Sequence, residues 1–101
     1  MSRLRTAIYA SEIDRFCRKW GVMKLSVFGS ALRDDFGPDS DVDLLVELDS
    51  SKKIGMYEWV QMIDELREIL GRDVDLVEKD AVRNPFRLKA IMEDAELIHA
   101  A

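Results

Sequence analysis

The stretch GSALRDDFGPDSDVDLLVEL, residues 29–48, places a Gly-Ser pair ten residues ahead of an Asp-x-Asp that opens an apolar run. The run reads as a β-strand, in which side chains alternate between two faces, so Asp41 and Asp43 share one face. Val42 and Leu44 point to the other face, towards a core. Two carboxylates on one strand face repel each other and lose hydration on burial, so a fold keeps them there only if a cation arrives.

Length and composition limit what this protein can be. The chain has 101 residues, which is enough for one core but too few for separate catalytic and substrate domains, so we expect a single domain over 1–101. No apolar run approaches the roughly 18 residues of a membrane span, which predicts a soluble protein without membrane contact. The net charge is -5, so no basic field attracts a phosphate polymer, and nucleic acid is an unlikely partner on these grounds.

The N-terminal residues and the single cysteine bear on location. Glu12, Asp14 and Arg15 interrupt any apolar segment of the kind that directs secretion, so we expect a cytoplasmic protein. Cys17 is the only cysteine in the sequence, which excludes an internal disulfide and a Cys-x-x-Cys metal site. We expect Cys17 to be a small core residue.

Helical and strand patterns alternate along the chain without linkers or repeats. Alternating apolar residues predict strands at 23–28, 41–48, 73–78 and 96–99. Apolar residues at helical spacing predict helices at 4–20 and 54–70, each followed by a glycine, and Asn84-Pro85 predicts the start of a helix that runs to about Glu93. Residues 31–35 are consistent with a short helical turn. These elements predict an α+β fold, a small sheet covered by helices, with strand directions left open.

The longest expected helix, at 54–70, carries an apolar stripe at spacings of three and four. The members of this stripe are Met56, Trp59, Val60, Ile63, Leu66, Ile69 and Leu70. We expect the Met and Trp residues of this helix to be core and not a binding surface. His99 stands alone near the end of the sequence, and nothing in the pattern implies a partner for it.

A third carboxylate extends the acidic pair. Asp75 lies between apolar residues in the expected strand 73–78, and three carboxylates converge if that strand lies beside the one that carries Asp41 and Asp43. Carboxylate oxygens suit Mg²⁺, whose coordination is usually completed by water and substrate phosphates. We therefore predict a metal site that binds a nucleotide. Asp73 is the competing candidate for the third carboxylate.

The Gly-Ser pair fits a phosphate site. A glycine lets the backbone approach a ligand closely, and amides at a following helical turn, with the Ser30 hydroxyl, can hold a phosphate. Arg33, one turn further on, would add positive charge. Two plainer interpretations stay open: Gly29-Ser30 as an ordinary strand-to-helix turn, and Arg33 as a surface ion-pair partner of Asp34 or Asp35.

A plainer interpretation also exists for the acidic pair. Asp41 and Asp43 would then be solvent-facing positions of an amphipathic edge strand, with no ligand between them. Strand order decides between this alternative and a metal site.

The motif as a whole resembles a known signature. Gly29-Ser30, ten intervening residues, Asp41-Val42-Asp43 and a later Asp75 resemble the signature of the DNA polymerase β-type nucleotidyltransferase superfamily. The resemblance covers the chain from about residue 23 onward, and the small size is similar to that of minimal nucleotidyltransferases that act as antitoxins beside a HEPN-domain toxin. It implies a small mixed sheet with helices packed on it, as in the polymerase β palm. Arg33 matches these proteins, whereas Asp34 departs from the glycine that many of them have.

The resemblance also implies an activity. It indicates a Mg²⁺-dependent enzyme that moves AMP from ATP to a hydroxyl and releases pyrophosphate, with Asp41 and Asp43 holding two ions. Asp75 would bind the second ion and could accept the proton, and Gly29, Ser30 and Arg33 would bind the nucleotide. By resemblance, the acceptor is a tyrosine of a cognate HEPN toxin in a hetero-oligomer with this chain, a type VII-like antitoxin arrangement.

Two other functions stay open on the sequence alone. The chain could be a binding-only antitoxin that blocks its toxin sterically, with the carboxylates left over from an active ancestor. It could instead transfer a nucleotide to a small molecule or to an RNA end. The intact set Asp41, Asp43 and Asp75 favours catalysis over the first alternative.

Overall fold

The computed structural model describes residues 7–29, 41–49, 51 and 53–100. In chain order the elements are α1 (Ala7–Trp20), β1 (Val22–Phe28), β2 (Val42–Leu48), α2 (Met56–Leu70), β3 (Val74–Glu78), the 3-10 turn η3 (Lys79–Ala81), α3 (Pro85–Asp94) and β4 (Glu96–Ala100). All four predicted strands are present, with each end within one residue of the prediction. The predicted helix at 54–70 begins two residues later, and the helical turn expected at 31–35 lies outside the described residues.

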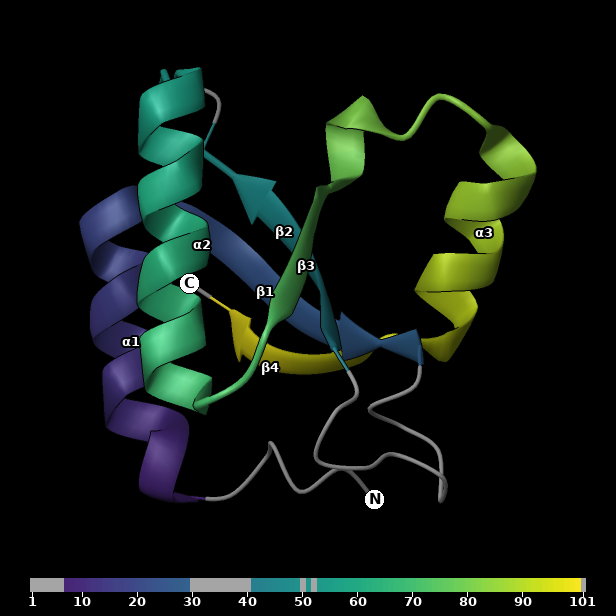
Figure 1. Cartoon of the computed structure of the whole chain (residues 1–101). Coiled ribbons are helices and arrows are strands. Elements are labelled where there is room, and N and C mark those ends of the chain that lie inside the picture. The colour runs from purple at the N-terminus through teal and green to yellow at the C-terminus, as the bar shows by residue number, and fades with distance from the viewer. Residues whose placement is uncertain (1–6, 30–40, 50, 52, 101) are drawn as a thin grey trace.

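The four strands form one mixed sheet in the order β3-β2-β1-β4. β1 pairs antiparallel with both β2 and β4, whereas β2 and β3 are parallel. A parallel pair needs a crossover connection, and α2 provides it between β2 and β3. The segment with α3 then runs from β3 at one edge of the sheet to β4 at the other (Figure 1). The predicted α+β class with a small mixed sheet is therefore confirmed.

Helices α1 and α2 lie side by side over one face of the sheet (Figure 1). The core that they enclose is made of Ile13, Phe16, Cys17, Val22, Leu25, Val27, Val42, Leu44, Val46, Met62, Leu66, Leu70 and Leu76. Cys17 is 1% exposed, which confirms its expected place in the core, and burial raises the pKa of its thiol to about 12. A thiol in that state is protonated and a poor nucleophile.

The expected core stripe of α2 is only partly right. Leu66 and Leu70 are buried, and Met62, which the stripe did not include, is fully buried. Met56 is instead 79% exposed, so the expectation that it is core is wrong, and Val60 of the stripe is 48% exposed. Within the described residues, the helix that packs beside α2 is α1, and it lies along the other side.

Polar contacts tie α1 to α2 along that other side. Trp20 Nε1 donates a hydrogen bond to Glu65 Oε2 at 2.8 Å, and Lys19 forms an ion pair with the same carboxylate. Burial opposes ionisation of Glu65, but the hydrogen bonds from Lys19 and Trp20 outweigh it and hold the pKa of this carboxyl below its usual value. The contact therefore fixes how α2 sits beside α1.

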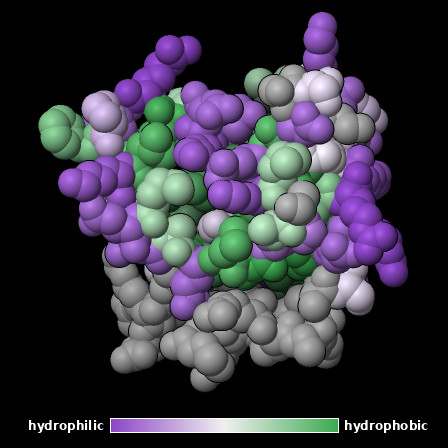
Figure 2. Space-filling model, turned by 180° about the vertical axis from the view of Figure 1, so that it is seen from behind, coloured by the Kyte–Doolittle hydropathy of each residue, from purple (hydrophilic) through white to green (hydrophobic). Residues whose placement is uncertain are grey.

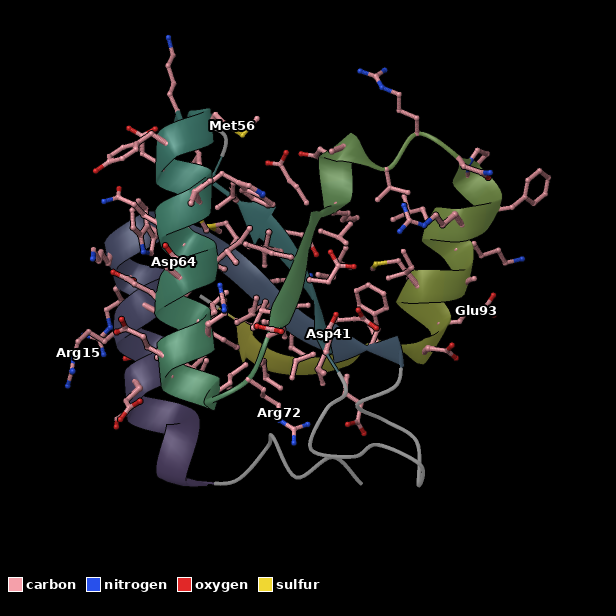
Figure 3. All side chains as sticks on the ribbon, in the orientation of Figure 1. Arg15, Asp41, Met56, Asp64, Arg72 and Glu93 are labelled. Atoms are coloured by element: carbon pink, nitrogen blue, oxygen red, sulfur yellow. The ribbon has the colours of Figure 1, made fainter. Side chains whose placement is uncertain are left out.

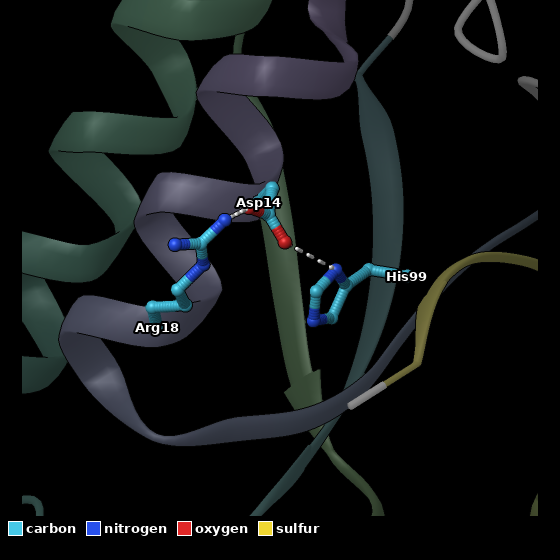
Figure 4. Close-up of polar contacts among 3 residues, drawn as sticks. All are labelled: Asp14, Arg18 and His99. Atoms are coloured by element: carbon cyan, nitrogen blue, oxygen red, sulfur yellow. Dashed lines mark hydrogen bonds and ion pairs between the residues drawn. The ribbon is translucent and has the colours of Figure 1, made fainter.

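His99 has a partner that the sequence did not imply. Its Nδ1 lies 3.7 Å from Asp14 Oδ1, and Asp14 also forms an ion pair with Arg18 one turn further along α1 (Figure 4). Asp14 thus links α1 to the last strand of the sheet. Asp14 and His99 are far apart in sequence, so no local pattern could have indicated this contact.

The described surface includes several large apolar side chains, among them Met56, Tyr57 and Phe86. From behind (Figure 2), apolar and hydrophilic side chains are interspersed over the visible face. The longest described helix, α2, has 15 residues. No helix within the described ranges has the length and apolar character needed to cross a bilayer.

The predicted cap of α3 is confirmed and gives a stability test. Asn84 Oδ1 accepts hydrogen bonds from the backbone N–H groups of Phe86 at 2.9 Å and Arg87 at 3.2 Å, with Pro85 in the first helical position. We expect Asn84→Ala to lower the free energy of unfolding by about 1 kcal/mol, because two helix N–H groups lose their acceptor. Urea denaturation of the whole chain measures this loss. The capping variant Asn84→Asp should retain most of the stability, and an equal loss in both variants would show that the cap is not the cause.

Candidate active site

Two of the predicted carboxylates lie on neighbouring strands. In the parallel pairing of β2 with β3, Asp43 is in register with Asp75. Residues in register point to the same face of a sheet, and neighbouring strands are about 4.8 Å apart. Asp43 is half-buried and Asp75 is exposed. The structure therefore places these two side chains together on the face opposite to Val42 and Leu44, as the sequence predicts.

Strand register also separates Asp75 from its competitor Asp73. Asp73 precedes β3, and its backbone carbonyl accepts a hydrogen bond from the N–H of Val42 at 2.9 Å. Its side chain lies 3.0 Å from Arg67 Nη2, at the end of α2. Asp73 therefore joins α2 to the start of the parallel pair, and Asp75 is the carboxylate that faces Asp43.

Asp41 lies just before β2, two residues ahead of Asp43, and is exposed. Figure 3 shows Asp41 and Arg72 towards the same end of the sheet, the end at which β2 begins. β2 has a neighbour on each side, β3 and β1. The alternative that Asp41 and Asp43 belong to an edge strand is therefore wrong, because Asp43 occupies an interior strand.

Gly29 is positioned against the carboxylate of Asp43. β1 pairs Phe28 with Asp43, so the next residue lies beside that side chain. Gly29 has a φ of 73°, and a Cβ built on it would lie 2.2 Å from Asp43 Oδ2. A residue with a side chain therefore conflicts with Asp43 as well as with the backbone conformation. Gly29 thus leaves space for the Asp43 carboxylate where it lies, a proximity that the sequence did not reveal.

The other predicted nucleotide-binding residues, Ser30 and Arg33, lie outside the described residues. Their proposed contact with phosphate stays a prediction, as does the close approach of Gly29 to a ligand. The positive φ of Gly29 is consistent with a tight turn directly after β1.

The donor set suits a magnesium ion in its chemistry. The candidate ligands are carboxylate oxygens, which Mg²⁺ prefers, and Gly29 leaves space at one of them. Across residues 7–29, 41–49, 51 and 53–100, however, no group of three or more acidic, histidine or cysteine side chains is close enough to hold an ion as it stands. The three-carboxylate site stays a prediction, supported by the pairing of Asp43 with Asp75.

Two arginines at the same end of the sheet were not singled out from the sequence. Arg67 and Arg72 line an open polar pocket of about 470 Å³ between the end of α2 and Asp73. Arg72 is half-buried. The signal that could have identified them is their place at the close of a helix, directly before the strand that carries Asp75.

Two comparisons of the sequence with known proteins agree with each other. The family model for the nucleotidyltransferase domain matches residues 12–98. A Methanocaldococcus jannaschii protein that is provisionally assigned as a protein adenylyltransferase is 37% identical over 76 residues, which are 75% of this chain and 76% of that protein.

Solved structures share the fold. One of a provisionally assigned minimal nucleotidyltransferase has a TM-score of 0.75 at 24% identity, and the similarity covers 95% of each chain. A complex of a tri-AMPylated HEPN toxin of Shewanella oneidensis with its MNT antitoxin has a TM-score of 0.66 at 16% identity, covering 93% of this chain and 71% of the other.

Proposed function

This chain belongs to the nucleotidyltransferase domain family, and we propose that it transfers AMP from ATP to a hydroxyl group of another protein. The observation that carries the proposal is the register of Asp43 with Asp75, with Gly29 making room for the Asp43 carboxylate. Two carboxylates on neighbouring strands can hold the Mg²⁺ that a reaction at a nucleotide phosphate uses. The assignment of the Methanocaldococcus relative supports AMP and a protein acceptor.

We assign the roles within the site as follows. Asp41, Asp43 and Asp75 would hold two Mg²⁺ ions, and Gly29, Ser30 and Arg33 would hold the triphosphate. When bound, Mg²⁺ neutralises charge on the phosphates and makes the acceptor hydroxyl more acidic. The hydroxyl oxygen attacks the α-phosphorus, the bond to the β-phosphate bridging oxygen breaks, and pyrophosphate leaves. Asp75, the exposed member of the pair, accepts the proton of the hydroxyl.

The proposed acceptor is a tyrosine of a HEPN-domain toxin, which the modification silences. Support comes from the fold that this chain shares with the antitoxin bound to an AMPylated HEPN toxin. An acidic chain with a net charge of -5 suits an acceptor that is basic around its target hydroxyl, because opposite charges speed encounter and align the two surfaces. In this proposal residues 1–101 act as a single catalytic domain and form a hetero-oligomer with the toxin.

Position-specific labelling of ATP tests the reaction. With the HEPN-domain protein, Mg²⁺ and ATP, we expect label from the α-phosphate to appear on the acceptor while label from the γ-phosphate is released as pyrophosphate. Omitting Mg²⁺, with EDTA present, should prevent transfer, because the phosphate charge is then not neutralised. Label from the γ-phosphate on the acceptor would mean phosphoryl transfer instead. Unlabelled acceptor together with labelled RNA or a labelled small molecule would identify another substrate class.

A further inference from the structure

We propose that the outer edge of β3 (Val74–Glu78) is the docking site for the protein acceptor, and that an extended, basic segment of the acceptor adds to the sheet there as a further strand. The proposal rests on the proposed function, because it assumes a protein acceptor. It adds which part of this chain holds that protein, and in which conformation the segment around the target hydroxyl is held.

The hydrogen bonds between β2 and β3 determine which backbone groups of β3 point outward. The N–H of Val42 donates to the carbonyl of Asp73, and the parallel register continues along β3 without a shift. In a parallel ladder every second residue of a strand bonds to the neighbouring strand, so Asp75 and Val77 bond to β2. The backbone N–H and C=O groups that point to the outer side belong to Val74, Leu76 and Glu78.

These outward groups are available to another chain. β3 is an edge strand, with β2 as its neighbour in the sheet, and Figure 1 shows β3 in front of β2. Among the hydrogen bonds between described residues, none involves the outward N–H or C=O groups of β3. A row of such groups at a sheet edge recognises an extended peptide, because a strand offers the same donors and acceptors at the same spacing.

A strand added at this edge would have its side chains on the correct face. Every second residue of the added segment points to the face of the sheet that carries Asp43 and Asp75. The residue beside Asp75 would lie about 4.8 Å from it, the spacing between strands, so its hydroxyl can reach the proposed metal site. The other edge strand, β4, is separated from β2 by β1 and is therefore farther from Asp43.

The charges beside this edge favour a basic segment. Glu78 is half-buried at the end of β3, and Asp80 is exposed just after it. Within the part of the chain that the structure describes, neither carboxylate forms an ion pair. Lys79, which lies between them, is already paired with Glu47 at 3.5 Å. An acceptor segment with lysine or arginine near its hydroxyl residue complements these carboxylates.

The same charges disfavour a second copy of this chain at the edge. Two β3 strands paired edge to edge would bring Asp75, Glu78 and Asp80 of one copy close to the same residues of the other. Like charges on facing positions destabilise a pair of strands. Each copy also has a net charge of -5, which adds repulsion at long range. A separate basic segment avoids both costs.

Amide hydrogen exchange tests the strand addition residue by residue, because a hydrogen-bonded N–H exchanges more slowly than a free one. The whole chain is measured by NMR alone and then with the purified HEPN-domain protein, without ATP. We expect Asp75 and Val77 to be protected in both samples. Leu76 and Glu78 should exchange at least about tenfold more slowly when the acceptor is present. Unchanged exchange at Leu76 and Glu78, or full protection of both in the chain alone, would overturn the docking site.

Two substitutions at Glu78 separate the backbone from the side chain. Glu78→Pro removes the outward N–H, and the φ of -85° at this edge position is close to the range of a proline ring. Glu78→Gln removes the charge and keeps the N–H. We expect Glu78→Gln to raise KM for the acceptor a few-fold and Glu78→Pro to raise it about tenfold, with kcat and Mg-ATP affinity unchanged.

Equal effects of the two Glu78 variants would contradict strand addition, because only the proline variant loses the N–H. Urea denaturation shows whether the proline variant is folded. The exchange experiment uses the unchanged chain, so it decides the question even if that variant unfolds.

The remaining outcomes separate docking from catalysis. Protection of Leu76 and Glu78 by the acceptor without any AMP transfer would support the docking site and reject the enzymatic function. AMP transfer to an acceptor that leaves these amides unprotected would support the enzyme and overturn the docking site. Protection that increases with the concentration of this chain alone would assign the edge to a second copy and overturn the proposal.

Discussion

Asp43→Asn is expected to lower AMP transfer by about 100- to 1,000-fold, the range seen when one group that stabilises developing charge is removed. Asp43 is the carboxylate that lies beside Gly29 and in register with Asp75. The substitution keeps the shape of the side chain and removes its charge. Because two neighbouring carboxylates repel each other, the folded variant should be as stable as the parent or slightly more stable. The rate of label transfer from α-labelled ATP and urea denaturation measure the two effects.

Asp73→Asn is the matched control for this experiment. It makes the same chemical change two residues before Asp75, at a side chain that pairs with Arg67. Loss of an exposed ion pair costs less than about 1 kcal/mol, and transfer should stay within a few-fold of the parent. Undiminished transfer by Asp43→Asn, or an equal loss in both variants, would contradict the assignment of Asp43 to the metal site.

Gly29→Ala is expected to weaken Mg-ATP binding by at least tenfold and to destabilise the fold. The added Cβ would lie 2.2 Å from Asp43 Oδ2, so either the carboxylate or the strand end must move. A φ of 73° adds a cost of about 1 kcal/mol for a residue other than glycine. Calorimetric titration with Mg-ATP measures the first effect, and denaturant unfolding measures the second.

The variant Gly71→Ala separates the effect on Mg-ATP binding from the effect on stability. Gly71 has a φ of 70° at the end of α2, but a Cβ built there meets nothing within 4 Å. Gly71→Ala should therefore show the backbone cost alone, with Mg-ATP binding unchanged. Equal ATP affinity in Gly29→Ala and the parent would favour the alternative that Gly29-Ser30 is an ordinary turn.

Much of the fold could be predicted because its signals are local. The alternation in DVDLLVEL places Val42 and Leu44 in the core, and both are fully buried. Glycines at the ends of α1 and α2 have positive φ, as a helix stop requires. Strand order and direction were not predictable from these patterns, because pairing depends on contacts between distant segments. That order made β2 an interior strand and excluded the edge-strand alternative.

The sequence predicted which residues belong to the candidate site, but it predicted only part of their arrangement in space. Asp41, Asp43 and Asp75 follow from spacing and strand context, but the choice of Asp75 over Asp73 needed the parallel register. The contact of Gly29 with Asp43 joins β1 to β2 and leaves no trace in local sequence. Met56 was placed in the core wrongly, because periodicity gives the width of an apolar stripe but not the element that covers it.

The central claim, that this chain modifies a protein covalently with AMP, is tested most directly by the intact mass of the HEPN-domain protein after reaction. The acceptor is incubated with this chain, Mg²⁺ and ATP, separated from the chain, weighed by mass spectrometry and assayed for recovered toxicity. We predict a mass increase by one or more AMP groups on tyrosine and persistent inactivity, because a covalent mark outlasts dissociation. An acceptor of unchanged mass that regains activity on separation would contradict the account and identify the chain as a steric antitoxin.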